Sequence, residues 1–279
     1  MSKSFKLHNE VAIPAIGFGT YKLQEGEECY NAVKIALDNG YRHIDTAAVY
    51  ANEVSVGKAV NDSNINREAI FVTTKVWNTE RGFDKTMQAF EASLERLQLD
   101  YVDLYLVHWP ANSQQFSNAK ELNAETWRAM EEIYKSGRAK AIGVSNFMVH
   151  HLIDLKETAE ILPMVNQIEY HPGYLQQDTV DFCQQNGILV QAWSPLGRGR
   201  VLYDSTLLEI AYKHNTTTSE VCLQFALQQG ICVLPKSATL SRIIANNQVN
   251  IVLKDEQIEA IKRMPELGFS GLNPDFVEF

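Results

Sequence analysis

The sequence contains few cysteines, and none of them lies in a metal-binding or redox pattern. The four that are present, Cys29, Cys183, Cys222 and Cys232, are far apart in the chain. No C-x-x-C pair occurs, and no histidine stands beside a cysteine at the spacing of metal ligands. We therefore expect four reduced thiols, most of them buried, and no metal.

Long hydrophobic runs are also missing, so no segment is apolar enough or long enough to span a bilayer. The first ten residues, MSKSFKLHNE, lack the apolar stretch that a secretory signal needs. These two absences predict a cytoplasmic protein. Positive charge is in the minority, with 25 Lys and Arg against 34 Asp and Glu. The net charge of -9 argues against nucleic acid or an anionic membrane as a partner.

A Pro/Ser-rich linker, a low-complexity tract and a shift of composition along the chain are absent as well. At 279 residues the chain has the length of two average domains, but α/β barrels of this size are common as one domain. We therefore expect a single domain over residues 1–279.

Short apolar runs alternate with helical patterns through the rest of the sequence. Residues 4–13 alternate around the turn-forming His8-Asn9-Glu10 and predict a small hairpin. Several later runs, such as YVDLYLV, are apolar throughout, as strands covered on both faces are. The predicted strands are residues 16–18, 43–45, 70–75, 102–107, 140–144, 164–168, 188–192 and 231–234. Eight strands alternating with helices favour an α/β fold, a (β/α)8 TIM barrel, over a doubly wound open sheet.

Active sites of such barrels are built from the loops at the C-terminal ends of the strands. Polar or ionisable residues stand at nearly every one of these ends in this sequence: Gly19-Thr20, Asp45, Lys75, His108-Trp109, Ser145-Asn146, Gln167, Trp193-Ser194 and Lys236-Ser237. Stability alone gives no reason for a lysine, a histidine and an aspartate in such places. We therefore predict the functional site at this rim.

Residues 40–57, GYRHIDTAAVYANEVSVG, carry the most distinctive part of the rim. Asp45 ends a predicted strand, and Tyr50 follows it in a loop that precedes a helical pattern. This pair suits proton chemistry. Alternatively, Asp45 caps a helix and Tyr50 is a packing residue, and the segment alone does not decide between the two interpretations.

Lys75, at the end of IFVTTK, favours proton chemistry. In a barrel mouth its ammonium needs a counter-charge, which Asp45 on the neighbouring strand supplies, whereas a lone Lys75 is better explained as a snorkelling surface residue. We expect the cation to lower the pKa of Tyr50 from its reference of about 10 towards working pH, as suits a general acid. His108, in LYLVHWP, can hydrogen-bond a substrate oxygen from a second direction, although a lone histidine is more often structural.

No Ser/His/Asp or Cys/His arrangement supplies a nucleophile. A carbonyl that is polarised by a tyrosine and a histidine, in a site that has no protein nucleophile, suggests that a cofactor supplies hydride. Trp193 offers a flat face for a nicotinamide ring, unless it is a core aromatic. Ser145, Asn146 and Gln167 carry the polar atoms that a carboxamide requires.

A cluster of cations near the C-terminus suits a phosphate group. One short loop and the helix start after it contain Lys236, Ser237 and Arg242. Such a cluster suits the phosphate on the ribose of NADP. The alternative is a solvated charged turn. Gly197-Arg198-Gly199-Arg200 adds flexibility and charge where a pyrophosphate could pass. A G-x-G-x-x-G turn is absent, so a Rossmann site is not expected.

Over nearly its whole length the sequence resembles the aldo-keto reductases, in particular the branch with bacterial glyoxal, methylglyoxal and diketogluconate reductases. GYRHIDTAAVYANEVSVG is similar to the family's first signature, with Asp45 and Tyr50 in the places of its catalytic aspartate and tyrosine. VTTKVWN puts Lys75 at the catalytic lysine, and LYLVHWP puts His108 at the catalytic histidine. GVSNF, NQIEYHP, AWSPLG and PKSATLSR resemble the successive cofactor-binding segments.

The resemblance implies a barrel that binds NADPH across its C-terminal mouth and reduces aldehydes and ketones, small dicarbonyls included, to alcohols. It implies that Tyr50 gives the proton, that Lys75 and Asp45 tune it, and that His108 orients the carbonyl. The implied substrate contacts are Tyr21, Tyr50, Trp77, His108 and Trp109. The implied cofactor contacts are Gly19, Thr20, Asp45, Ser145, Asn146, Gln167, Trp193, Ser194, Leu196, Gly197, Arg198, Lys236, Ser237, Arg242 and Asn246. A monomer is typical of the family.

Two places depart from the family's pattern. Ala245 stands where a glutamate often precedes the asparagine that faces adenine, which affects one adenine contact. Only a few residues separate Arg200 from Leu207, so a long lid over the pyrophosphate is not expected. We therefore expect faster cofactor exchange than in relatives that have a lid.

Two other classes of function fit part of the pattern. Asp45, His108, Glu169 and His171 could surround the ion of a metal-dependent barrel hydrolase, but metal barrels usually have more closely spaced ligands, and no H-x-H occurs. A non-catalytic module that senses NADPH is the other alternative. The presence of all four predicted catalytic residues favours turnover over sensing.

Overall fold

The computed structural model describes residues 4–279. A two-stranded antiparallel sheet opens this part of the chain and consists of β1 (Ser4–Lys6) and β2 (Ala12–Pro14). The turn between them is held by Asn9, whose Oδ1 accepts the backbone N–H of Val11 at 3.2 Å. The predicted hairpin is therefore confirmed.

Eight parallel strands follow and form the barrel wall in the order β10-β9-β8-β7-β6-β5-β4-β3. The barrel closes through the residues just before β3, because Gly17 N donates to Val233 O at 2.8 Å and Val233 N donates to Ala15 O at 2.9 Å. The strands are β3 (Phe18–Gly19), β4 (His43–Asp45), β5 (Phe71–Val76), β6 (Val102–Val107), β7 (Ala139–Ser145), β8 (Val165–Glu169), β9 (Leu189–Trp193) and β10 (Cys232–Leu234). All eight predicted strands are confirmed, with small shifts at their ends.

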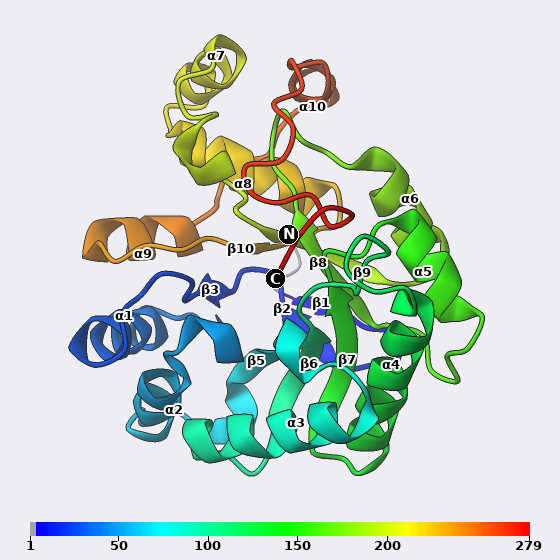
Figure 1. The fold of residues 1–279 in the computed structure, drawn as a ribbon. Coiled ribbons are helices and arrows are strands. Elements are labelled where there is room, and N and C mark those ends of the chain that lie inside the picture. The colour runs from blue at the N-terminus through cyan, green and yellow to red at the C-terminus, as the bar shows by residue number, and fades with distance from the viewer. Residues whose placement is uncertain (1–3) are drawn as a thin grey trace.

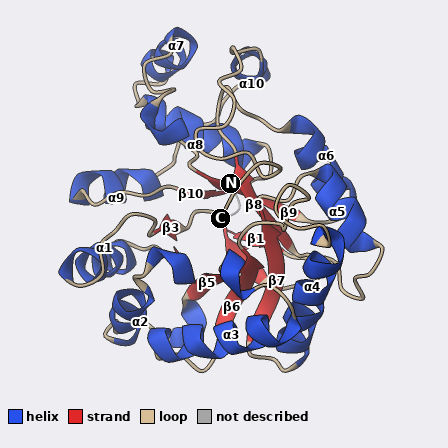
Figure 2. Ribbon diagram, in the orientation of Figure 1, coloured by secondary structure: helices blue, strands red, loops and turns tan. Residues whose placement is uncertain are grey.

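Helices surround this barrel on the outside (Figures 1 and 2). They are α1 (Glu27–Asp38), α2 (Glu53–Asn61), α3 (Phe83–Leu97), α4 (Ala119–Lys135), α5 (Val149–Lys156), α6 (Gln177–Gln185), α7 (Ser205–Lys213), α8 (Thr218–Gln228), α9 (Leu240–Asn247) and α10 (Asp255–Lys262). Within residues 4–279, four short 3-10 helices lie in the loops: η1 (Ala48–Tyr50), η2 (Arg67–Ala69), η3 (Asn78–Glu80) and η4 (Gly197–Gly199). Apolar side chains of strands and helices form one continuous buried core. Each large side chain buried there contributes about 1.5–3 kcal/mol.

All four cysteines are free and buried, which confirms the predicted thiols. Burial raises the pKa of Cys29, Cys222 and Cys232 to about 12 and that of Cys183 to about 11. In residues 4–279, no helix combines the length and the apolar character that crossing a bilayer requires.

The segment after α10, residues 263–279, runs back over the C-terminal mouth of the barrel, where the chain ends at the centre of the view in Figure 1. It is tied to loops on several sides of the mouth. Leu267 N donates to Gly173 O at 2.7 Å, and Asn112 Nδ2 donates to Val277 O at 2.9 Å. The segment thus covers part of the rim at which the functional site is predicted.

Candidate functional site

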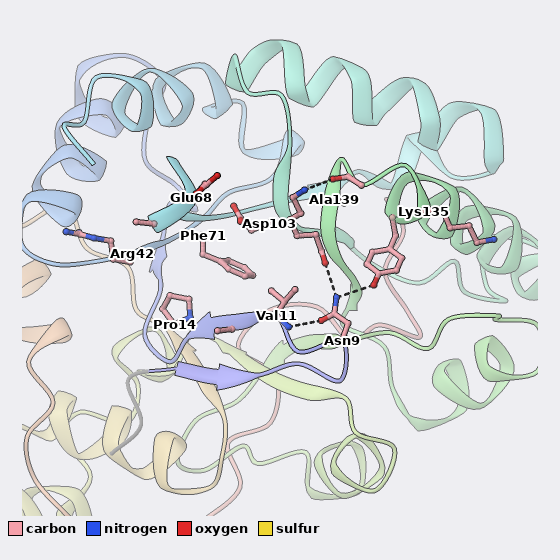
Figure 3. A pocket seen from close by; sticks show the side chains of 14 residues that line it. Asn9, Val11, Pro14, Arg42, Glu68, Phe71, Asp103, Lys135 and Ala139 are labelled. Carbon is pink, nitrogen blue, oxygen red and sulfur yellow. Dashed lines mark hydrogen bonds between the residues drawn. The ribbon is translucent and has the colours of Figure 1, made fainter. Parts of the chain in front are cut away.

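The two ends of the barrel differ in what their side chains can do. A cavity of about 630 Å³ lies at the N-terminal ends of the strands, beside the hairpin (Figure 3). Three of its charged side chains, Arg42, Glu68 and Lys135, point away from its centre, and the carboxylate of Asp103 is already paired with Arg67 at 2.8 Å. The uncharged side chain of Asn9 does face the cavity, but its Nδ2 already donates to Lys140 O at 2.9 Å. The polar side chains that do converge are at the other end.

Lys75 and Asp45 form a buried ion pair at the C-terminal ends of neighbouring strands β5 and β4. Lys75 Nζ donates to Asp45 Oδ1 at 2.6 Å and to Thr46 O at 2.8 Å, and its side chain is 0% exposed. Burial lowers the pKa of Lys75, against the opposing attraction of Asp45. The sequence-based pairing of these two residues is confirmed. Removing one partner from such a pair leaves an uncompensated buried charge.

Asp45 is held on its other side by Gln167, which reaches across the barrel interior from β8. Gln167 Nε2 donates to Asp45 Oδ2 at 2.8 Å. The backbone oxygen of Asp45 also accepts from Thr20, through its N at 3.0 Å and its Oγ1 at 2.9 Å. Both carboxylate oxygens are therefore engaged, so the orientation of Asp45 is fixed.

Tyr50 ends the short helix η1, directly above the ion pair. The loop that carries it is fixed by the buried Asn52, whose side chain accepts from Thr46 Oγ1 at 2.7 Å and donates to Thr20 O at 3.0 Å. Lys75 Nζ lies 5.1 Å from the centre of the Tyr50 ring. The predicted neighbourhood of tyrosine, lysine and aspartate is thus confirmed.

The expected lowering of the Tyr50 pKa is wrong for this structure. Burial raises the pKa of Tyr50 well above 10.0, and the negative charge of Asp45 adds to the effect. The ammonium of Lys75 does not overcome this effect, because its two hydrogen bonds go to Asp45 and Thr46 and not to the Tyr50 hydroxyl. The hydroxyl of Tyr50 is therefore firmly protonated.

His108, just after β6, faces Tyr50 with its ring. The ring centres are 5.6 Å apart and the planes are nearly perpendicular, at 76°. Burial, and after it the charge of Lys75, lowers the pKa of His108 well below 6.5. Its Nδ1 is buried without a partner in residues 4–279, so a proton there would find no acceptor. A neutral ring with its proton on Nε2 satisfies these constraints best.

Three predicted cofactor residues form one bonded group across β7 and β9. Trp193 Nε1 donates to Asn146 Oδ1 at 2.8 Å, and Asn146 Nδ2 donates to Ser145 Oγ at 3.0 Å and to His108 O at 2.9 Å. Asn146 has a φ of 64°, in the left-handed region that residues other than glycine rarely adopt. Such local strain is typical of functional sites. Trp193 is only partly buried, so part of its ring is accessible from the barrel mouth.

The residues predicted to hold phosphate lie on two segments. Lys236 and Arg242 are exposed and form no ion pair within residues 4–279, and Arg242 is in the first turn of α9. Ser237 Oγ accepts from Thr239 N at 3.0 Å. One unneutralised cation in the loop before α9 and a second in its first turn suit an anion. The segment with η4 places the Arg198 guanidinium 5.7 Å from the Trp193 ring.

Aromatic side chains surround the space above Tyr50 and His108, as predicted for Tyr21, Trp77 and Trp109. Tyr21 lies 5.0 Å from Tyr50 between ring centres. Phe279, the last residue of the C-terminal segment, stacks on Trp77 at 5.2 Å and meets Trp109 edge-on at 5.6 Å. In the sequence, the only indication of this contact is the position of Phe279 in the C-terminal segment.

The four residues considered as ligands of a metal hydrolase do not gather among the residues that the structure describes. Asp45 is bonded to Lys75. Glu169 instead lies 3.2 Å from His171 Nε2 and accepts the N–H of Ser270 at 3.0 Å. This arrangement anchors the C-terminal segment and gives no support to the metal hydrolase.

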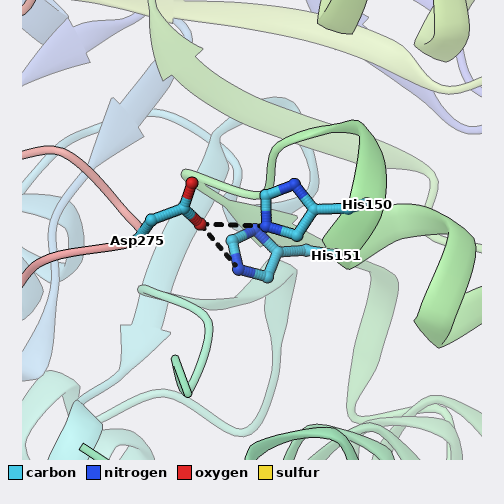
Figure 4. A group of neighbouring side chains, drawn as sticks. All are labelled: His150, His151 and Asp275. Atoms are coloured by element: carbon cyan, nitrogen blue, oxygen red, sulfur yellow. Dashed lines mark hydrogen bonds and ion pairs between the residues drawn. The ribbon is translucent and has the colours of Figure 1, made fainter. Parts of the chain in front are cut away.

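One group in residues 4–279 does have the composition of a metal site: His150, His151 and Asp275 (Figure 4). The Nε2 atoms of His150 and His151 lie 2.9 and 3.4 Å from the same oxygen, Asp275 Oδ1. However, His151 Nδ1 accepts the N–H of Met148, so the ring's proton is on Nε2 and no lone pair faces the carboxylate. The group is better described as a polar contact that holds the C-terminal segment against α5.

The closed barrel, with its polar cluster at the C-terminal mouth, defines an enzyme of the TIM-barrel class. The chain belongs to the aldo/keto reductase family, whose family model matches residues 15–266. It is therefore an oxidoreductase, an aldo-keto reductase.

Similar proteins match the chain over its full length. The glyoxal reductase of Bacillus subtilis (strain 168) is 46% identical over 280 residues, which cover 100% of this chain and 99% of that protein. MGS-M4, an aldo-keto reductase from a Medee basin deep-sea metagenome library, has a TM-score of 0.93 and 43% identity, with 99% of this chain and 100% of that one covered. A mutant of Gox0644 in complex with NADPH has a TM-score of 0.92 and 38% identity, with 100% of both chains covered.

Proposed function

We propose that this chain reduces aldehydes and ketones, glyoxal and methylglyoxal among them, with NADPH as the cofactor and Tyr50 as the proton donor. One observation carries the proposal. The hydroxyl-bearing ring of Tyr50 and the imidazole of His108 face each other at the barrel mouth, directly above the buried pair of Lys75 and Asp45.

The proposed chemistry uses two donors on one substrate oxygen. His108 Nε2–H orients the carbonyl by a hydrogen bond, and the Tyr50 hydroxyl gives its proton to the oxygen as negative charge develops there. Lys75 lies close enough to stabilise the phenolate that remains. Asp45 keeps this lysine charged and in place. The four side chains thus act as one unit.

The side chains at the mouth fit a dinucleotide with a nicotinamide at one end and a phosphate at the other. Gln167 Oε1 has no hydrogen-bond partner in residues 4–279, so it can accept from a carboxamide N–H. Trp193 offers its ring for stacking, and the cations Lys236 and Arg242 suit a ribose phosphate. When bound there, NADPH supplies the hydride.

The substrate class follows from the walls of the mouth and from the relatives. Trp77, Trp109 and Phe279 make an apolar aromatic surface beside the two donors. A small or flat carbonyl compound fits such a wall better than a highly charged one. The similar Bacillus protein is named a glyoxal reductase, which supports glyoxal-type dicarbonyls as substrates.

The proposal is tested by following NADPH absorbance with methylglyoxal and with a panel of aliphatic and aromatic aldehydes. Turnover of several members is expected, as is conversion to the corresponding alcohols. NADPH binding without consumption of any carbonyl would indicate the sensing module instead. We further propose a single-domain, monomeric, cytoplasmic enzyme, and light scattering of the purified chain would reveal a higher oligomer.

Reduction is expected to be nearly independent of pH between about pH 6 and pH 9. Burial raises the pKa of Tyr50 well above 10.0, so its hydroxyl stays protonated as the pH rises through this range. Burial lowers the pKa of His108 well below 6.5, so its ring stays neutral at the acid end. The profile of kcat/KM for methylglyoxal reports these groups in the free enzyme. A steep fall that begins between about pH 7 and pH 8 would instead show an acidified tyrosine.

Cofactor exchange is expected to be fast and to proceed in one step. The helix α7 begins at Ser205, so only residues 201–204 separate it from Arg200. This segment is too short to fold over a bound pyrophosphate as a lid. Stopped-flow fluorescence should show one phase whose rate rises linearly with NADPH concentration. A slow isomerisation after binding is the contrary result.

A further inference from the structure

Three polar side chains lie in a row inside the barrel, next to the predicted catalytic residues. Gln167 on β8, Gln191 on β9 and Cys232 on β10 stand opposite one another in the parallel register of the sheet. Their exposed fractions are 2%, 0% and 0%. Apolar side chains of similar size would fill the same space without the cost of burying amides. The row therefore calls for an explanation beyond packing.

The three side chains form one hydrogen-bonded chain that begins at Asp45. Gln167 Nε2 donates one hydrogen to Asp45 Oδ2 at 2.8 Å and the other to Gln191 Oε1 at 2.7 Å. Gln191 Nε2 donates to Cys232 Sγ at 3.4 Å. Cys232 Sγ donates to the backbone oxygen of Pro14, also at 3.4 Å, where β2 ends.

The direction of every bond in this chain is fixed by its two ends. A carboxylate at Asp45 and a carbonyl at Pro14 can only accept. Burial raises the pKa of Cys232 to about 12, so the thiol keeps the proton that it donates. A flipped Gln167 amide would place its own oxygen against the Asp45 carboxylate. Its nitrogen must therefore face inward, and its oxygen Oε1 is left for another partner.

We propose that Gln191 is a positioning residue for the cofactor. It accepts the second N–H of Gln167 and so holds that amide with Nε2 on Asp45 and Oε1 towards the nicotinamide carboxamide. This inference rests on the proposed function. Without the acceptor on Gln191, one buried N–H of Gln167 has no partner, and the amide rotates to find one. Gln167 then loses its alignment with both Asp45 and the cofactor.

The direct test replaces Gln191 with an apolar side chain of similar length, Gln191→Met. Fluorescence titration is expected to show an NADPH Kd about three- to tenfold higher than that of the wild type, the effect of one lost or misaligned hydrogen bond. The kcat for methylglyoxal should fall by a similar factor. Its KM should stay unchanged, because Gln191 does not touch the predicted substrate pocket.

Two further variants separate positioning from a general loss of stability. Gln191→Glu, studied at about pH 6 where burial keeps the new carboxyl neutral, still offers an acceptor to Gln167 and should restore most of the NADPH affinity. Gln224→Met removes an equally buried glutamine, which is 1% exposed. Gln224 lies on α8, takes no part in the hydrogen bonds that link Asp45 to Cys232, and donates to Gln228 at 2.7 Å. It should lower the melting temperature and leave the NADPH Kd within about twofold of the wild-type value.

Equal NADPH affinities of Gln191→Met and Gln224→Met would overturn the inference, as would a failure of Gln191→Glu to improve on Gln191→Met. If Gln191→Met does not fold, Cys232→Ala is compared with Cys222→Ala. Both variants remove a buried thiol, but only Cys232→Ala removes the acceptor of the Gln191 side chain. Only Cys232→Ala should therefore raise the NADPH Kd, by about twofold or more. A wild-type protein that neither binds NADPH nor reduces a carbonyl would refute the proposed function instead.

Discussion

Tyr50→Phe is expected to lower kcat/KM for methylglyoxal by about 10²–10⁴-fold, the usual contribution of a general acid. The substitution removes one hydroxyl and keeps the ring, so the contacts of Tyr50 with His108 and Tyr21 remain. The loss should lie mostly in kcat, because the proton is needed only as the carbonyl oxygen becomes negative. Steady-state kinetics with NADPH in excess measures it.

The control for this variant is cofactor binding. The Tyr50 hydroxyl is assigned to the substrate oxygen and not to the nicotinamide, so the NADPH Kd of Tyr50→Phe should remain within about twofold of that of the wild type. His108→Phe, by contrast, should raise KM as well as lower kcat, since it orients the carbonyl. Full activity in Tyr50→Phe would show that another group gives the proton.

Lys75→Met should cost more stability than Tyr50→Phe, His108→Phe or Gln191→Met. It leaves the carboxylate of Asp45, 3% exposed, without its cation, and such an unpaired buried charge costs about 3–5 kcal/mol. For a chain of this size that lowers the melting temperature by roughly 10 °C. Reduction should also fall, on the order of 10²-fold, because no ammonium remains to stabilise the phenolate. Calorimetry and steady-state kinetics measure the two effects.

The double variant Asp45→Asn with Lys75→Met separates the two roles of the pair. A neutral amide at residue 45 removes the buried charge, so most of the lost stability should return. Activity should not return, since the cation is still absent. Recovery of activity together with stability would mean that the ion pair only maintains the fold.

The positions of the strands were predictable because each one is a short apolar run between helical patterns. Parallel strands of a barrel share one direction, so residues that follow them in sequence, such as Asp45, Lys75 and His108, must meet at one rim. Their meeting does not depend on how the side chains pack, and the structure brings these three residues together. It also explains why the ion pair was predicted from residues that are 30 positions apart.

Properties that depend on burial could not be predicted in the same way. Whether the pKa of Tyr50 rises or falls depends on how much of its ring the surrounding loops cover, and sequence spacing gives no measure of this. Gln191 was overlooked because its partners lie on other strands, although a glutamine within the apolar run ILVQA is itself a signal of a buried polar contact. Phe279 likewise reaches Trp77 only through the course of the C-terminal segment.

Deuterium transfer tests the central claim most directly. NADPH labelled with deuterium at the hydride position is incubated with methylglyoxal and the wild-type chain, and the alcohol is analysed by mass spectrometry and NMR. The account predicts one deuterium on the carbon that was the carbonyl, with a hydroxyl proton from Tyr50 that exchanges with solvent. An alcohol without deuterium, or labelled NADPH that remains unconsumed while bound, would contradict it.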